Sequence, residues 1–198
     1  MYQGNKIDKR VIKTKDSLKR ALVKLLIDNK LENVSIIALT NAAEINRKTF
    51  YLHYKDVASV YKEITGNLCD KIINQIISTS WEEIENENTI YNVLSIIEND
   101  EFVVSLLKDT IYAKRITSLI ESVIIENIYN KYLQKHLNNN SKQVYTIIEF
   151  NVYGCMRVFL NWIKGKENTD LRDLSKGLSL LTYKVLPQWL KTFYFKIL

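Results

Sequence analysis

The stretch SIIALTNAAEINRKTFYLHY, residues 35–54, has the pattern of two short helices joined by a tight turn. Ser35 can begin the first helix by accepting a hydrogen bond from a free backbone N–H group. Ile36, Leu39 and Ala43 then fall at i, i+3 and i+7, which places them on one helical face. The chain turns at residues 44–46, so the stretch predicts a helical hairpin.

The second helix of this hairpin should begin at Asn46, whose side chain can cap it. Ile45 can pack on Phe50 as a hydrophobic staple, which fixes the direction in which the chain enters the helix. At about 100° per residue, Phe50 and Tyr54 share the inner face. Such a helix suits the major groove of DNA, where its first residues touch base edges. The outward face and its flanks carry Arg47, Lys48, Thr49, Tyr51, Leu52 and His53.

An ordinary helical hairpin with a solvated basic face has the same spacing, and spacing alone leaves this alternative open. The run TFYLHY, residues 49–54, resembles the TetR family of bacterial transcriptional regulators. The DNA-binding domain of that family has a pattern near T-x3-IA-x2-AGV-s-x-g-t-x-Y-x-HF. The residues that match it are Ser35, Leu39, Ala43, Ile45, Asn46, Thr49, Tyr51, His53 and Tyr54.

The resemblance implies an all-α protein of two domains. Residues 1–62 are expected to form a three-helix helix-turn-helix DNA-binding domain. A long helix should join it to a helical dimerisation and ligand-binding domain, residues 63–198. In the family, movement of such a helix usually couples effector binding to DNA release.

Position and resemblance together predict a set of DNA contacts. Arg47 and Lys48 can meet phosphate or pair with guanine O6 and N7. The family positions that touch bases or phosphates add further residues, Tyr51 among them through its hydroxyl. His53 has a purely structural role as its alternative. The full set is Ser35, Asn46, Arg47, Lys48, Thr49, Tyr51, His53 and Lys55.

Two residues depart from the family pattern. Glu44 stands where the family usually has a glycine in the turn. If that position needs a left-handed backbone, a glutamate there costs roughly 1–2 kcal/mol. Val57 stands where the family usually has a lysine that touches phosphate, and Lys55 is the candidate to replace it.

The charge of the chain is unevenly distributed. Residues 1–62 hold 13 Lys or Arg against 6 Asp or Glu, a balance of +7, whereas residues 63–198 hold 15 against 16. The excess positive charge therefore lies in the N-terminal third, as expected of a segment that meets a polyanion. A solvated basic surface is the alternative. One Pro and five Gly in 198 residues are too few for an all-β fold.

Periodicity predicts further helices at residues 14–29, 56–79, 89–98, 100–112, 114–137 and 143–163. Residues 1–12 are expected to be a poorly ordered arm, and residues 81–88 a linker. In the helix from residue 56, Ile73 and Ile77 should continue the inner stripe. Thr169 should cap a last helix, which Pro187 ends or kinks.

The segment FNVYGCMRVFLNWIKGKENTDLRDLSKGL, residues 150–178, resembles a branch of TetR-like regulators that includes dihydroxyacetone-kinase operon regulators. The resemblance implies a homodimer whose seam comes from the last two long helices. An intrachain core explains the same apolar residues, so these are candidates for core or seam: Val152, Tyr153, Met156, Phe159, Leu160, Ile163, Leu174, Leu178 and Leu181. An effector pocket would use Trp81, Phe102, Tyr112, Tyr129 and Tyr132. A protein partner in place of a small molecule is the alternative.

Several classes of function find no support in the sequence. Cys69 and Cys155 are far apart, and His53 and His136 are the only histidines, so neither a disulfide framework nor a zinc site is expected. The sequence has no nucleophile with a base and no phosphate-binding glycine loop, so we expect neither an enzyme nor a cofactor. No run of 18 apolar residues occurs, so we expect a cytoplasmic protein that does not span a membrane.

The best prediction is a dimeric regulator, by family default a repressor, that inserts residues 46–54 into a palindromic operator. A helical interaction module that binds an acidic partner is the alternative.

Overall fold

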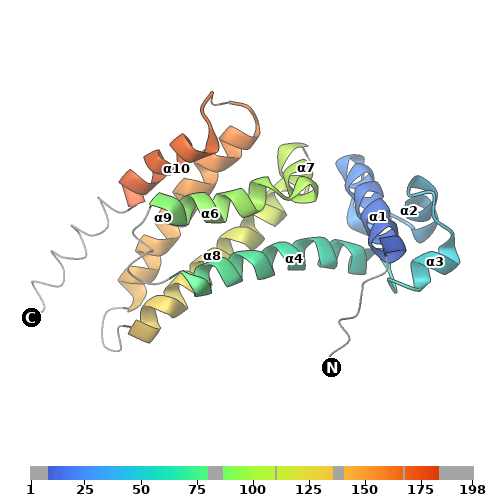
Figure 1. The fold of residues 1–198 in the computed structure, drawn as a ribbon, viewed down its shortest axis with the longest axis horizontal. Coiled ribbons are helices and arrows are strands. Elements are labelled where there is room, and N and C mark those ends of the chain that lie inside the picture. Colours follow the sequence, from blue (N-terminus) through green and yellow to red (C-terminus); the bar gives the residue numbers. More distant parts are fainter. Residues whose placement is uncertain (1–8, 80–86, 110, 136–140, 167, 183–198) are drawn as a thin grey trace, which may run out of the picture.

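The computed structural model describes residues 9–79, 87–109, 111–135, 141–166 and 168–182. Within these ranges the chain is helical and has no strand (Figure 1). The elements in chain order are α1 (Lys9–Asp28), η1 (Leu31–Asn33), α2 (Ile36–Ala42), α3 (Arg47–Tyr51), α4 (Val57–Ser78), α6 (Glu87–Glu98), α7 (Glu101–Asp109), α8 (Ala113–Lys135), α9 (Ser141–Ile163) and α10 (Leu171–Leu180). The predicted all-α class is therefore confirmed.

The first three α-helices form one unit around a shared apolar centre. Leu18, Leu22 and Leu26 recur along one face of α1 and are fully buried. Leu39 of α2 and Phe50 of α3 are also fully buried in this core. Burying one such side chain contributes about 1.5–3 kcal/mol. The short helices α2 and α3 therefore depend on α1 for their stability, because isolated helices of this length are marginal in water.

Helix α4 connects this unit to the rest of the chain (Figure 1). Asp56 caps its start, because the carboxylate accepts the Ser59 N–H at 2.7 Å. The helix packs against α1 at its beginning and against α6, α7 and α8 further along. Its inner stripe is Val57, Val60, Tyr61, Ile64, Leu68, Ile72 and Ile76.

The far end of α4 is held by a lysine of α8. The Lys131 ammonium donates hydrogen bonds to the carbonyl oxygens of Ile76 at 2.7 Å and of Ile77 at 3.1 Å, and also to that of Thr79. The last carbonyls of a helix have no partner inside the helix and carry partial negative charge, so a cation there is favourable. This contact joins the end of α4 to α8.

The C-terminal helices form two packed pairs, α6 with α10 and α8 with α9. Helix α7 contacts α8 and α9 and also reaches back to α1. The core of this part includes Leu94, Leu106, Ile116, Ile120 and Phe159. The apolar centre is therefore continuous from α1 to α10.

Several predictions from the sequence are wrong in detail. Helix α1 begins at Lys9, so residues 9–12 are not part of a loose arm, and residues 1–8 lie outside the described residues. Ile77 is 66% exposed and does not belong to the inner stripe of α4. Asp170, rather than Thr169, caps α10 by accepting the Asp173 N–H at 2.8 Å. The expected linker, apart from Glu87 and Asn88, and Pro187 also lie outside the described residues.

No helix in the described part of the chain combines the length and the apolar character needed to cross a membrane. Cys69 and Cys155 are free thiols, half-buried rather than fully buried, and burial raises the pKa of both.

Candidate nucleic-acid interface

The turn between α2 and α3 has the hydrogen bonds of a Schellman motif. The Glu44 N–H donates to the Asn41 carbonyl at 3.1 Å, and the Ile45 N–H donates to the Thr40 carbonyl at 2.9 Å. This geometry requires a left-handed residue after the helix, and Glu44 has φ of 56°. The expected strain at Glu44 is therefore present, and the turn of the hairpin keeps its usual shape without a glycine.

Helix α3 presents one face to the core and the other to solvent. Phe50 is fully buried and Tyr54 is 5% exposed, as predicted for the inner face. Ile45 packs against the same core, in the place of the predicted staple. On the outside, Tyr51 is 52% exposed and Leu52 is 79% exposed. The outward face of α3 is therefore open to a partner.

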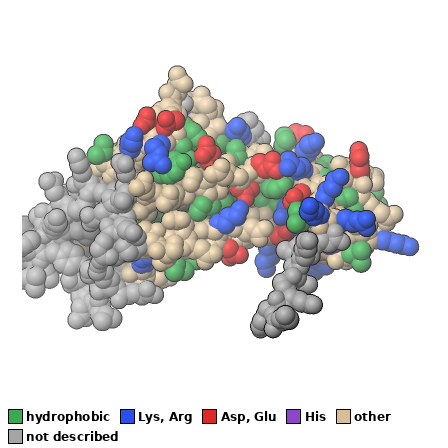
Figure 2. All heavy atoms as spheres, in the orientation of Figure 1, with side chains coloured by type: hydrophobic (Ala, Val, Ile, Leu, Met, Phe, Trp, Pro, Cys, Tyr) green, Lys and Arg blue, Asp and Glu red, His purple; other side chains and the backbone are tan. Residues whose placement is uncertain are grey.

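The cations predicted to contact DNA lie on this outward side. Arg47, Lys48 and Lys55 are exposed, while Thr49 and His53 are half-buried. Within the described residues, neither Arg47 nor Lys48 forms an ion pair. Figure 2 shows Lys and Arg side chains gathered over the end of the molecule that α1, α2 and α3 form. The charge imbalance in the sequence therefore appears as a cationic end.

Ser35 and Asn46 have structural tasks in addition to the predicted DNA contacts. The Ser35 hydroxyl oxygen accepts the Ala38 N–H at 3.1 Å, and the Asn46 side-chain oxygen accepts the Lys48 N–H at 2.8 Å. Both side chains cap their helices as predicted, and both residues remain exposed. Val57, which replaces the usual lysine, is 7% exposed and belongs to the core, so it offers no phosphate contact.

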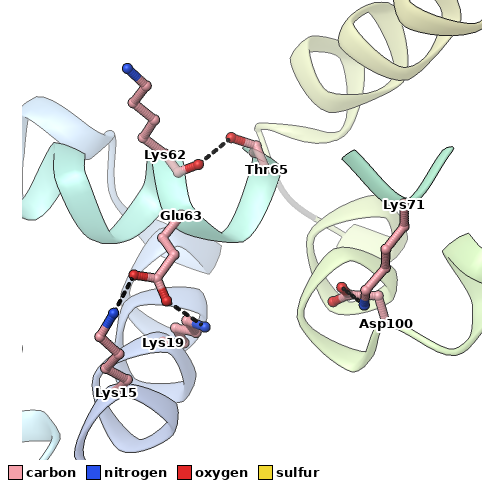
Figure 3. A network of polar contacts seen from close by, with 7 residues as sticks. All are labelled: Lys15, Lys19, Lys62, Glu63, Thr65, Lys71 and Asp100. Carbon is pink, nitrogen blue, oxygen red and sulfur yellow. Dashed lines mark hydrogen bonds and ion pairs between the residues drawn. The ribbon is translucent and has the colours of Figure 1, made fainter. Parts of the chain in front are cut away.

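A cluster of charged side chains joins α1 to α4 (Figure 3). Glu63 of α4 accepts hydrogen bonds from the ammonium groups of Lys15 at 2.8 Å and Lys19 at 2.9 Å, both on α1. Burial raises the pKa of Glu63, but the two lysines outweigh burial and hold that pKa below its ordinary value. Lys15 also lies over the ring of Tyr54, 5.3 Å from its centroid. Burial and the nearby Glu63 carboxylate raise the pKa of Tyr54, so its phenol stays protonated.

A second set of contacts joins the cationic end to the C-terminal helices. Arg20 of α1 pairs with Glu101 of α7 and lies over the ring of Phe102, 5.5 Å from its centroid. The Leu31 N–H donates to the hydroxyl of Tyr112, whose ring packs 5.7 Å from that of Tyr61. We name these contacts, which join α1, η1 and α4 to α7 and to the turn after it, the α1–α7 junction.

The described residues predicted to line an effector pocket lie in two different places. Phe102 and the buried Tyr112 belong to the α1–α7 junction. Tyr129 packs edge-on against Tyr145 of α9, at 5.1 Å between centroids. Trp81 and the side chain of Tyr132 lie outside the described residues.

The structure divides the core-or-seam candidates of the last two long helices. Tyr153 is 47% exposed and Leu181 is 65% exposed, and Leu160 is half-buried. The sequence analysis missed two further exposed apolar residues beside them, Phe150 at 78% and Leu180 at 54%. Phe150 lies three positions before Tyr153, and this helical spacing was the available signal. The remaining candidates lie in the chain's own core: Val152, Met156, Phe159, Ile163, Leu174 and Leu178.

Glycines accompany this exposed apolar face, which we define as Phe150, Tyr153, Leu180 and Leu181. Gly154 and Gly177 lie within α9 and α10 and are exposed, and a Cβ atom added at either would meet no neighbour within 4 Å. Cys155 Sγ lies 3.7 Å from the Thr182 hydroxyl oxygen, so α9 and the end of α10 adjoin.

Among the side chains that the structure describes, no three His, Cys, Asp or Glu gather to hold a metal ion.

Comparison with known proteins supports the helix-turn-helix interpretation. No family model matches the sequence. The HTH-type transcriptional regulator YxbF of Bacillus subtilis is 29% identical over 98 residues, which cover 47% of this chain and 26% of YxbF. The chain therefore spans only about a quarter of the length of this curated relative.

Solved structures share the fold across most of the chain. A TetR transcriptional regulator from Streptococcus agalactiae is 19% identical with a TM-score of 0.56, covering 88% of this chain and 96% of its own. The dihydroxyacetone kinase operon activator DhaS is 16% identical with a TM-score of 0.50, covering 85% and 93%. At these identities the likeness concerns the fold, and membership in the dihydroxyacetone-kinase branch stays a prediction. The arrangement of α1 to α10 is the fold of the TetR-family transcriptional regulators.

Proposed function

We propose that this protein is a dimeric DNA-binding transcriptional regulator that inserts α3 into the major groove of a palindromic operator. The observation that carries the proposal is the two-sided character of α3. Phe50 and Tyr54 hold it from inside, while Arg47, Lys48 and Tyr51 face solvent at the cationic end. A helix held in this way can enter a groove without losing its own core contacts.

The outward side chains suit different parts of the DNA. Arg47 and Lys48, exposed at the start of α3, can neutralise phosphate or donate to guanine O6 and N7. The exposed Tyr51 hydroxyl can reach phosphate, and Lys55 lies beyond the end of α3, where Val57 offers no charge. Thr49 and His53 are half-buried, so we assign them shorter-range contacts at the groove edge.

Dimerisation is the second part of the proposal. One short helix reads few base pairs, so useful affinity needs two copies on half-sites roughly 34–36 Å apart. The large apolar side chains exposed on α9 and α10 suit a second copy of the chain, because exposed apolar surface marks interaction sites. Gly154 and Gly177 leave room for a partner helix to approach closely.

Control by an effector is the third part. The α1–α7 junction connects the cationic end directly to the C-terminal helices, in addition to α4. A ligand or a protein partner that shifts α7 would therefore act on α1 through Arg20 and on η1 through Tyr112. Repression is what the family resemblance implies, although DhaS is described as an activator. A reporter gene placed behind the selected operator decides between the two.

Selection from a random duplex library with the purified full chain tests the DNA-binding proposal. We expect a palindromic consensus with half-sites about one helical turn apart. Affinity for it should exceed that for random duplex about 10³-fold or more and fall steeply as salt rises. Enrichment of no sequence, or equal binding to heparin and duplex, would reject the proposal and favour a module for acidic partners.

A further inference from the structure

Leu52 is an apolar side chain placed on the outward face of the DNA-binding end. It is 79% exposed, although a leucine is ordinarily a core residue. Its backbone remains right-handed helical, with φ of −70° and ψ of −20°. Leu52 therefore lies one turn beyond Lys48 on the same face, opposite the buried Phe50.

The surroundings of Leu52 decide which kind of partner can cover it. Single exposed leucines are common on protein surfaces, but this one shares its helical face with the exposed Lys48, and Arg47 and Lys55, five positions before it and three after it, are exposed as well. An apolar protein surface that covered Leu52 would also have to desolvate these charges, which is costly without partners. A polyanion that also carries an apolar group between its charges can compensate the cations and cover Leu52.

The major groove of DNA is such a surface. Its edges carry phosphates, and the apolar group among its base-pair edges is the C5-methyl of thymine. We infer that Leu52 packs against a thymine C5-methyl group and so sets a thymine preference at one position in each half-site. This inference rests on the proposed insertion of α3 into the major groove.

The size of the effect follows from the methyl group alone. Uracil pairs with adenine as thymine does and differs only by lacking this methyl. Removing one buried methyl from the interface should weaken binding roughly fourfold. A dimer that covers two half-sites should lose roughly fifteenfold when both methyls are removed.

The experiment uses the full chain and the duplex sequence that it selects from a random library. Each thymine of that duplex is replaced by deoxyuridine at symmetric positions, and affinities are measured for the wild type and for Leu52→Ala. We expect one thymine position where the wild type loses roughly fifteenfold and Leu52→Ala loses less than about twofold. Ile77→Ala, which removes another exposed apolar side chain at the far end of α4, should keep the full wild-type response.

The outcomes separate this inference from the proposed function. If the library yields no consensus, the proposed function fails. If it yields one, but no thymine position responds to deoxyuridine, the inference alone fails. A position that responds equally in the wild type and in Leu52→Ala also overturns it, because another side chain then contacts the methyl. Leu52→Met keeps an apolar contact and should restore most of the response.

Discussion

The two ends of this molecule expose different chemistry. At one end, α3 presents cations together with the large apolar side chain of Leu52. Helices α9 and α10 lie toward the other end (Figure 1). Their exposed apolar side chains are Phe150, Tyr153, Leu180 and Leu181. A charged surface gains affinity from a polyanion and loses it in salt, whereas an apolar surface gains affinity from removal of water.

This difference means that the two proposed partners should be separable by mutation. Substitutions in α3 should affect DNA binding without changing the mass of the assembly. Substitutions on α9 and α10 should change the mass first and DNA binding as a consequence. A result that mixes the two would show that the ends are not independent.

The largest expected effect comes from charging the apolar face. Phe150→Glu with Leu181→Glu should convert a dimer into a monomer of 23.2 kDa at micromolar concentration, measured by light scattering after size exclusion. Each large side chain contributes about 1.5–3 kcal/mol when buried, so four in a dimer contribute about 6–12 kcal/mol, which is comparable with the roughly 8 kcal/mol of a micromolar contact. Ile111→Glu, at an exposed apolar residue outside this face, is the control and should leave the mass unchanged. If the double variant remains a dimer, the dimer seam lies elsewhere on the chain.

The next effect tests the cationic end. Arg47→Ala with Tyr51→Phe should weaken specific DNA binding at least about 100-fold, since each base or phosphate contact contributes roughly 1–3 kcal/mol and the dimer loses two of each. Fluorescence anisotropy with the selected duplex measures this. Tyr51→Phe keeps the ring that packs edge-on against Phe50, so folding should not suffer. Lys108→Ala, which removes an exposed cation of α7, should change affinity little. Unchanged operator affinity in the double variant would reject the contact assignment.

A smaller effect is expected when only the ion pairs that join α1 to α4 at the cationic end are weakened. Glu63→Gln should destabilise the chain by about 2 kcal/mol in denaturant unfolding, because Lys19 is left with a 12% exposed side chain and no carboxylate. The exposed pair of Arg20 and Glu101 is the control, and Glu101→Gln should cost less than about 1 kcal/mol.

This stabilisation should also depend on pH. The pKa of Glu63 is lower in the folded than in the unfolded chain. Its contribution is therefore complete above the unfolded pKa and disappears as pH falls through the folded pKa. The melting temperatures of wild type and Glu63→Gln should differ at neutral pH and converge below about pH 4. A difference in melting temperature that stays the same down to acid pH would show that the carboxylate is not its source.

The smallest effect on stability is expected at a type of turn that occurs twice in the chain. Helix α9 ends in the hydrogen bonds that also end α2, with Gly165 N–H donating to Trp162 and Lys166 N–H to Asn161. Gly165 has φ of 69°, close to the 56° of Glu44. Glu44→Gly should therefore stabilise the chain by about 1 kcal/mol, and Gly165→Ala should destabilise it by about the same amount. Equal destabilisation by both would mean that the Glu44 side chain offsets its strain.

Features that depend on neighbouring residues could be predicted from the sequence. The caps at Ser35 and Asn46 and the buried Phe50 and Tyr54 lie where local spacing placed them. Those signals act within one or two helical turns, so no knowledge of the tertiary fold is needed.

Contacts between distant segments could not be predicted in the same way. Tyr112 and Leu31 are separated by 81 positions, and the tertiary packing of the helices brings them together. The exposure of Phe150 and the burial of Met156 depend on which neighbours cover α9. Apolar periodicity marks a face of a helix but does not name what lies against it.

The contact of Lys131 with the end of α4 has a mechanical consequence. The Lys131 ammonium bonds several carbonyls at one point, so it fixes the position of this end of α4 against α8. Helix α4 has 22 residues, and at about 1.5 Å per residue it is roughly 33 Å long and ends at this contact. A tilt of about 5° swings its other end by roughly 3 Å. That displacement is as long as a whole hydrogen bond, so a tilt of this size would move α3 away from a base edge in the proposed complex.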